Sequence, residues 1–295
     1  MFGKMLTALG LAALLATPAL ADLGLLLPDS PIVDDPEKKT LNLVVAVLDP
    51  TTGQGFPIER PQVLTALRYS GENVDRSEHL SVLNEAVAFG ARAWTTDIAL
   101  PHPGVYQLIM QTKVCWVPNQ DKFVQYITKV QIPAYGSSEG WDRPDNVSFE
   151  IAPLSRPFGL CSGMSFTGQA LFDGKPVPGA LIDVARLDPS IKPNVTEPVD
   201  PNALPQEDDK AQKPKKQDKP ITPQPISAFG STQQVKADAQ GVFSFTCPLP
   251  GWWAFSSSNA GDPLQDPDGR QKPLEIKTLF WVYISDCAKP APGKK

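Results

Sequence analysis

The sequence predicts an all-β protein made of two β-domains, the second of them a small antiparallel sandwich. The chain contains 32 prolines, and its hydrophobic residues fall mainly in short runs separated by turn residues. Before about Pro153, no segment repeats its apolar residues with the long 3.6-residue period of a helix. These observations favour strands joined by loops.

The first domain, residues 22–156, is predicted from a series of apolar runs. Thr40–Leu48 is rich in β-branched residues and ends at the turn signal Asp49-Pro50. Val105–Val114 and Lys122–Ile132 alternate apolar and polar residues on either side of a loop, which predicts a hairpin. Further candidates are strands at Gln62–Ser70 and Ala91–Ile98, and a strand or short helix at Leu80–Phe89.

The second domain, residues 157–287, is predicted from another series of short runs. Asp173-Gly174 lies between Met164–Phe172 and Val177–Arg186, an arrangement typical of a hairpin. Asp188–Pro225 holds nine prolines and no aromatic residue, so we expect a disordered insertion there. We also expect a flexible tail at residues 288–295. The remaining strands are expected at Thr232–Ala237, Val242–Cys247, Trp252–Ser256 and Thr278–Ser285.

The start of the chain has the three parts of a secretion signal. Lys4 supplies the positive charge, Met5–Leu15 is an apolar run too short to span a bilayer, and Ala19-Leu20-Ala21 provides small residues for the peptidase. We therefore expect Met1–Ala21 to be a signal peptide that is cleaved after Ala21, which leaves a periplasmic protein beginning at Asp22. No later segment is apolar enough to span a membrane.

The composition argues against a nucleic-acid partner. The formal net charge is −5, and the lysines near Lys210–Lys219 are neutralised by neighbouring carboxylates. A protein of this charge offers no basic stripe that could follow a phosphate backbone.

The four cysteines, an even number of isolated residues in an exported chain, predict two disulfides. In a Greek-key sandwich, strands 242–247 and 278–285 would run in the same direction one strand apart, which favours Cys247–Cys287 and, by elimination, Cys115–Cys161. Four cysteines allow three pairings, so the other two stay open. Zinc is the alternative, but zinc sites usually show closely spaced ligand pairs and none occurs here.

Candidate catalytic residues and motifs are few, and we expect a protein that is not an enzyme. The chain has two histidines, His79 and His102, and no Gly-x-Ser-x-Gly elbow or phosphate-binding glycine loop. A carboxylate pair of the glycosidase type stays open, because carboxylates are plentiful. Both histidines are interpreted first as loop or surface residues, with a ligand role as the alternative. Alternation places one of Trp252 and Trp253 in the core and the other at the surface, where it packs beneath loops or stacks on sugars.

Five phrases of the sequence resemble those of a known family: Phe123–Lys129, Tyr135–Pro144, Pro153–Gly159, Gln169–Ala180 and Lys236–Phe255. The likeness runs across nearly the whole predicted mature chain except Asp188–Pro225, and the order and spacing of the phrases make it specific. The family is the periplasmic component that accompanies energy-coupling-factor-type nickel and cobalt importers, grouped as a domain of unknown function. The resemblance implies an N-terminal β-domain, an immunoglobulin- or transthyretin-like sandwich, and capture or delivery of a divalent metal.

The resemblance also implies where metal ligands would lie. Members of the family begin their mature chain with histidine and carry further histidines in the loop after the first strand. Here these places hold Asp22 and residues 49–54, which begin with Asp49 and contain no histidine. The implied ligands are therefore the amine and carboxylate of Asp22 and the carboxylate of Asp49. We add His102 as a further candidate ligand, which the resemblance does not imply. Such a set would hold nickel weakly, because imidazole suits Ni²⁺ and Co²⁺ better than carboxylate oxygen does.

Two functions follow as hypotheses. The first is an extracytoplasmic, non-enzymatic protein of a nickel or cobalt uptake system, which binds a divalent metal as its only cofactor and has the importer's membrane subunit as its partner. The alternative is a structural or interaction protein of the cell envelope that binds a protein partner or a glycan.

Overall fold

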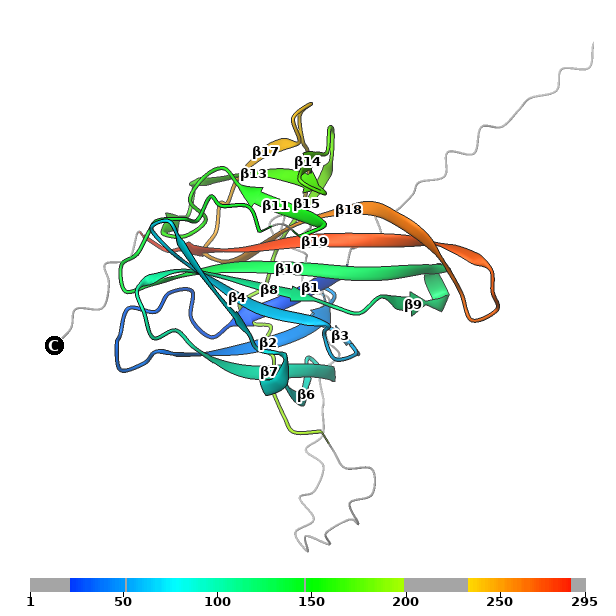
Figure 1. Cartoon of the computed structure of the whole chain (residues 1–295), viewed down its shortest axis with the longest axis horizontal. Coiled ribbons are helices and arrows are strands. Elements are labelled where there is room, and N and C mark those ends of the chain that lie inside the picture. The colour runs from blue at the N-terminus through cyan, green and yellow to red at the C-terminus, as the bar shows by residue number, and fades with distance from the viewer. Residues whose placement is uncertain (1–21, 51, 146, 199–232, 288–295) are drawn as a thin grey trace, which may run out of the picture.

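The structure is a computed structural model that describes residues 22–50, 52–145, 147–198 and 233–287. Its strands form three layers, a central sheet with one smaller sheet on each side (Figure 1). Helical structure within these ranges is limited to two short 3-10 turns, η1 (Leu80–Val82) and η2 (Pro118–Gln120). The all-β prediction is confirmed. In the same ranges, no helix has the length and apolarity needed to cross a membrane.

The central sheet has ten strands and contains residues from both predicted domains. β8 (Gly104–Gln111) pairs antiparallel with β10 (Lys122–Ala134), with Gln107 opposite Gln131, and this confirms the predicted hairpin. β10 in turn pairs in parallel with β19 (Gln271–Ser285). The main path runs through β16 (Gln233–Lys236), β15 (Leu181–Arg186), β18 (Gly251–Gln265), β19 (Gln271–Ser285), β10 (Lys122–Ala134), β8 (Gly104–Gln111), β4 (Val63–Ser70) and β5 (Asn73–Glu78), with β9 (Cys115–Val117) and β12 (Leu160–Cys161) beside it.

The five-stranded sheet, drawn below the central sheet in Figure 1 and called the lower sheet here, covers one face of the central sheet. Its edge strand β1 (Leu23–Pro28) runs so close to β10 that a Cβ on Gly24 would lie 2.6 Å from Oγ1 of Thr128. The indole nitrogen of Trp281 on β19 donates to the Gly24 carbonyl oxygen at 3.0 Å, which fixes the position of β1. The sheet consists of β1 (Leu23–Pro28), β2 (Thr40–Leu48), β7 (Ala91–Ala99) and β6 (Asn84–Ala88), with β3 (Gly55–Phe56) paired to β2.

The four-stranded sheet, drawn above the central sheet in Figure 1 and called the upper sheet here, covers the opposite face, and an aromatic core fills the space between the two sheets. Phe166 stacks on Phe280 of the central sheet at a centroid distance of 5.6 Å, and Phe243 and Phe255 pack around them. The sheet is built from β11 (Phe149–Pro153), β13 (Ser165–Phe172), β14 (Lys175–Pro176) and β17 (Val242–Thr246).

The central strands are buried on both faces. Along β19, Leu279 and Trp281 belong to the lower core, whereas Phe280 and Val282 belong to the upper core. This explains why residues 279–284 of β19 (LFWVYI) form a continuous apolar run instead of an alternating one. The predicted domain boundary after residue 156 stays a prediction, although β10 pairs with β19 and β11 pairs with β13 across it.

A buried charge cluster joins the central sheet to the upper one. The Lys129 ammonium lies 2.6 Å from Oδ2 of Asp145 and 2.8 Å from Oε2 of Glu150, and all three side chains are almost completely buried. Tyr69 donates its hydroxyl proton to the other oxygen of Asp145 at 2.9 Å. Burial alone would lower the pKa of Lys129, but the two carboxylates outweigh it and raise this pKa above its ordinary value.

The Asp173-Gly174 turn joins different strands from those predicted. Both residues have positive φ values, 47° and 71°, as a tight hairpin turn requires. The turn leads only into the two-residue strand β14, after which the chain crosses to the central sheet and forms β15. The predicted pairing of Met164–Phe172 with Val177–Arg186 is therefore wrong. Pro176 and Pro178 have no N–H with which to extend such a ladder.

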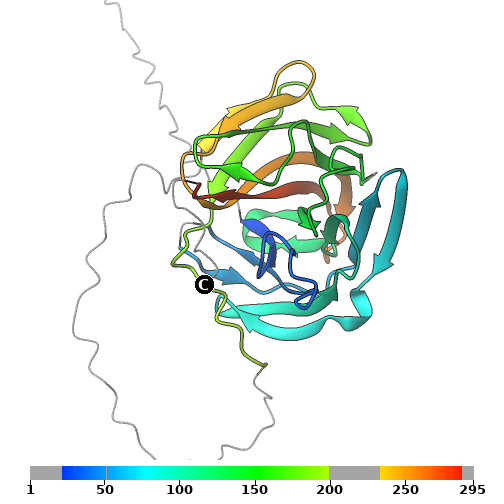
Figure 2. The ribbon, with the colours of Figure 1, turned by 90° about the vertical axis from the view of Figure 1, so that its left-hand side faces the viewer.

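The predicted insertion begins with an ordered segment. Residues 188–198 leave β15 and run along the edge of the lower sheet, as Figure 2 shows in yellow-green. Thr196 and Val87 exchange backbone hydrogen bonds of 2.9 and 3.0 Å, and the Phe89 amide donates to the Pro193 carbonyl at 2.8 Å. Ile191 packs against the lower core. The prediction of disorder is wrong for these residues, because β6 offers them a free edge.

Other predictions fall on residues outside the described ranges. These are the signal peptide Met1–Ala21, the insertion from residue 199 onward and the tail at residues 288–295.

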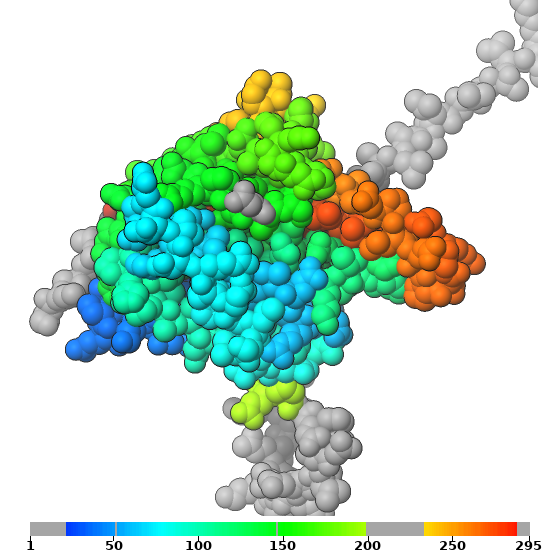
Figure 3. Space-filling view, viewed as in Figure 1, coloured from blue at the N-terminus to red at the C-terminus, as the bar shows by residue number. Residues whose placement is uncertain are grey.

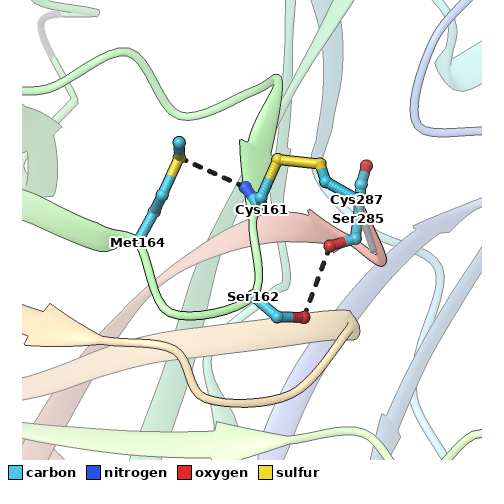
Figure 4. Close-up of a disulfide and its surroundings, with 5 residues drawn as sticks. All are labelled: Cys161, Ser162, Met164, Ser285 and Cys287. Atoms are coloured by element: carbon cyan, nitrogen blue, oxygen red, sulfur yellow. Dashed lines mark hydrogen bonds between the residues drawn. A yellow bond between two sulfur atoms is a disulfide. The ribbon is translucent and has the colours of Figure 1, made fainter. Parts of the chain in front are cut away.

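The disulfide of the structure joins Cys161 to Cys287, with their Cα atoms 5.5 Å apart (Figure 4). β12 pairs in parallel with the end of β19, which brings the two residues together. Cys115 and Cys247 are free thiols. The predicted pairs Cys115–Cys161 and Cys247–Cys287 are therefore wrong. They assumed that strands 242–247 and 278–285 share a sheet, whereas β17 and β19 lie in different layers.

Candidate functional site

Asp22 and Asp49 lie side by side at one end of the lower sheet. The β1–β2 ladder pairs Leu23 with Leu48, so the residue before β1 lies opposite the residue after β2. Burial raises the pKa of the half-buried Asp22 carboxyl, and the Asp49 charge raises it further, while Lys277 and Lys122 act in the opposite direction. The structure thus brings together two of the three ligands predicted from the sequence.

The loop after β2 orients Asp49. The Asp49 amide donates to the carbonyl of Gln54 at 2.9 Å, and the Gly53 amide donates to the carbonyl of Asp49 at 2.8 Å. The Thr52 amide donates to Oδ1 of the Asp49 carboxylate at 3.3 Å. Gly53 adopts a φ of 70°, which closes this tight turn. The carboxylate of Asp49 is therefore held by its own loop.

A cavity of about 250 Å³, the N-terminal pocket, opens beside Asp22. Aromatic and aliphatic side chains form most of its wall, and burial followed by the Asp22 charge raises the pKa of the Tyr126 hydroxyl. The ring of Trp116 packs against Phe123 at a centroid distance of 4.9 Å. The lining residues are Asp22, Val47, Phe56, Pro57, Ile58, Glu59, Thr112, Cys115, Trp116, Val117, Pro118, Val124 and Tyr126.

Two lysines balance the acidic charge near Asp22. Nζ of Lys122 lies 2.6 Å from Oε2 of Glu275, and Lys277 lies 4.0 Å from the same oxygen. Both lysines also lower the pKa of Asp22. Cations close enough to lower the pKa of Asp22 also repel a bound metal ion, so any metal held by the two aspartates would be held weakly.

His102 lies at the opposite end of the molecule. It precedes β8, whose first residue Gly104 pairs with Ala134 at the far end of β10, whereas Asp22 lies near Tyr126. Eight residues of strand separate these positions, which corresponds to about 25 Å. His102 therefore cannot share a metal with Asp22 and Asp49, and its place in the predicted ligand set is wrong. Within the described ranges, no group of three or more His, Cys, Asp or Glu side chains is placed to hold a metal ion.

The two free thiols should differ in reactivity. Burial raises the pKa of the Cys247 thiol to about 12, and Cys247 has no exposed surface. Cys115 lines the N-terminal pocket and is only partly buried, although its pKa is also raised. We expect iodoacetamide at pH 8.5 to alkylate Cys115 in the native protein and Cys247 only after unfolding. Mass spectrometry of the digested protein measures both, and equal labelling of the native protein would contradict this expectation.

Sequence reasoning missed the pocket residues around Asp22. Cys115 was expected in a disulfide, and the alternation of Lys122–Ile132 could not tell which of its faces would meet β1. The adjacent Cys115 and Trp116, a few residues before the alternating strand, were the sequence feature that could have indicated an apolar pocket there.

Comparison with known proteins gives a family for the chain. No curated protein matches it. One of the similar solved structures, the "D0-D1 domain of Intimin", has 10% sequence identity over 87% of this chain and 96% of that chain, at a TM-score of 0.18, too low to support any argument. The family profile described as "Domain of unknown function (DUF4198)" matches residues 19–261. The chain therefore belongs to the DUF4198 family of domains of unknown function.

Proposed function

We propose that this protein is a periplasmic, non-enzymatic binding protein that takes up a divalent transition metal, nickel or cobalt, at its mature N-terminus and delivers it to the membrane subunit of an importer. The observation that carries the proposal is the pairing of Asp22 with Asp49 at the end of the β1–β2 ladder. This pair lies where signal cleavage after Ala21 would create a free amine.

The ligand chemistry follows from these groups. The amine and carboxylate of Asp22 would bind one ion as a chelate, and Asp49 would add a second carboxylate. Mixed nitrogen and oxygen ligands give affinities in the order copper, nickel, cobalt. In the absence of imidazole and with two lysines nearby, we expect a nickel Kd that is roughly micromolar or weaker.

The family resemblance supports an uptake role for this pair. In the family that the sequence phrases resemble, histidines occupy the first mature position and the loop after the strand that corresponds to Thr40–Leu48, which is β2 in this structure. The corresponding positions here are Asp22 and the loop that begins at Asp49. The two places named by the resemblance are the two places that β1 and β2 bring together.

Titration of the mature protein with Ni²⁺ tests the proposal, with intact mass confirming that the chain begins at Asp22. We expect Asp22→Ala, Asp49→Asn and a one-glycine extension before Asp22 each to weaken binding by about tenfold or more, because each removes a ligand. His102→Ala is the matched control and should leave the affinity unchanged. Binding should weaken as the pH falls below the amine pKa of about 8, since the proton competes with the metal. A nickel affinity that is tight and is unchanged in all three variants would contradict the proposal.

A further inference from the structure

A second cavity, the strap pocket, lies between residues 188–193 and the ends of β1, β18 and β19. Its volume is about 560 Å³, within the range of cavities that bind small ligands. Residues 188–193 form one wall, in the segment that Figure 2 shows descending from the central sheet to the lower one. The pocket shares no lining residue with the N-terminal pocket, so it does not depend on the proposed metal site.

Two aromatic rings form the floor of the strap pocket. Trp252 and Tyr283 meet edge to face with ring centroids 5.2 Å apart, and both are half-buried. The neighbouring Trp253 lies in the core and donates its indole proton to the Leu249 carbonyl at 2.9 Å. By contrast, the Trp252 indole N–H and the Tyr283 hydroxyl form no hydrogen bond with any residue that the structure describes. The pocket therefore offers aromatic faces together with unused polar atoms.

Charged side chains of both signs stand around these rings. Arg186 is held in place because its Nε and one terminal nitrogen donate to the Pro250 carbonyl at 2.9 and 2.7 Å. Asp188 is held because its Oδ1 accepts protons from the amide and the hydroxyl of Ser190 at 2.8 and 2.7 Å. The lining carries three carboxylates, of Asp29, Asp188 and Asp286, and two cations, of Arg186 and Lys192.

We infer that the strap pocket binds a neutral saccharide. The C–H face of a sugar ring packs on an aromatic ring, while its hydroxyl groups both donate and accept hydrogen bonds. Hydroxyl donors suit the carboxylates, and hydroxyl acceptors suit the unused Trp252 N–H and the Lys192 ammonium. The single excess carboxylate disfavours an acidic sugar.

A proline-rich peptide is the competing ligand for an aromatic pocket. Its proline residues provide carbonyl acceptors and no N–H donors, so they could bond only to donors such as the Trp252 N–H. A saccharide hydroxyl can bond to that donor and can also donate to the carboxylates of Asp29 and Asp188, which have lone pairs beyond those that accept from Asn42 and Ser190. The polar groups of the strap pocket therefore favour the saccharide.

Calorimetric titration of the full mature chain tests this inference with three probes: tri-N-acetylchitotriose, trigalacturonate and a decaproline peptide. We expect the neutral chitotriose to bind more tightly than the other two. Trp252→Ala should weaken chitotriose binding by about tenfold or more, because it removes the stacking surface. Tyr283→Phe, which removes one hydroxyl and conserves the ring, should weaken it by a few fold.

Trp116→Ala is the matched control, because Trp116 is also half-buried but lines the N-terminal pocket. It should leave chitotriose binding unchanged. Three results would each overturn the inference: no chitotriose binding up to about 10 mM, equal chitotriose binding by the native protein and Trp252→Ala, or tighter binding of decaproline than of chitotriose.

Discussion

Lys129→Met is expected to lower the free energy of unfolding by about 3–5 kcal/mol. Lys129 is fully buried, and its ammonium is the cation placed between the carboxylates of Asp145 and Glu150 at 2.6 and 2.8 Å. Without it, two buried carboxylates would face each other with only the Tyr69 hydroxyl and the Asp145 amide as donors from the described residues. Desolvated charges without a partner are costly because the protein interior has a low dielectric constant.

Urea unfolding of the native protein and of matched variants measures this effect. Arg76→Met removes a cation from an exposed pair with Glu78, so it should change the unfolding free energy by less than about 1 kcal/mol. The triple variant Lys129→Met, Asp145→Asn, Glu150→Gln should recover part of the loss, since no charge then remains buried. A Lys129→Met protein as stable as the native one would show that the cluster contributes little.

The cluster also predicts how stability depends on pH. The folded-state pKa of Lys129 lies above its ordinary value of 10.5, so its contribution is fully present below that value and is lost as the pH rises through the folded-state pKa. The difference in unfolding free energy between the native protein and Lys129→Met should therefore be constant near neutral pH and shrink above pH 10.5. A difference in unfolding free energy that grows above pH 10.5 would contradict a raised pKa for Lys129.

Loss of the Cys161–Cys287 disulfide is the second large effect that we expect. The bond spans a sequence separation of 126 residues, for which the chain-entropy model gives up to about 5 kcal/mol. It also fastens β12 to the end of β19, where the Ser162 amide donates to the Ser285 carbonyl at 3.0 Å.

Calorimetric melting of the double variant Cys161→Ser, Cys287→Ser measures this contribution. We expect a clear fall in Tm, and the same fall when the native protein is reduced before heating. Cys115→Ser is the control and should melt within a few degrees of the native protein, because Cys115 is a free, partly buried thiol. An unchanged Tm for the double variant would show that the bond is not formed or does not constrain the unfolded chain.

Much of the strand content could be predicted from the sequence. Thr40–Leu48 was predicted with the bounds of β2, since β-branched residues and the Asp49-Pro50 turn mark them clearly. β18 and β19 were predicted too short. Their outer halves, Ser258–Gln265 and Gln271–Glu275, project as the hairpin coloured orange in Figure 3 and carry polar residues with no strand pattern.

Partners across layers could not be predicted. A local turn such as Asp173-Gly174 shows that the chain reverses, but it does not show that the next long strand joins another sheet. The disulfide pairing failed for the same reason. Lys129, Asp145 and Glu150 lie on a strand, a loop and another strand, so nothing in their spacing indicates that they meet.

The candidate metal site was predicted in part. Asp22 and Asp49 meet because β1 and β2 are antiparallel neighbours. The family resemblance indicated both positions as places for ligands, but no strand was predicted at Leu23–Pro28, so this pairing was not predicted. His102 was included for its chemistry, and the length of β10 separates it from the pair.

Anomalous X-ray diffraction from crystals of the mature protein grown with Ni²⁺ tests the central proposal most directly. We predict one strong anomalous peak within bonding distance of the Asp22 amine nitrogen and of a carboxylate oxygen of Asp49, and no comparable peak at His102. A peak at another place, or no peak at a nickel concentration well above the expected Kd, would contradict a metal-binding role for the mature N-terminus.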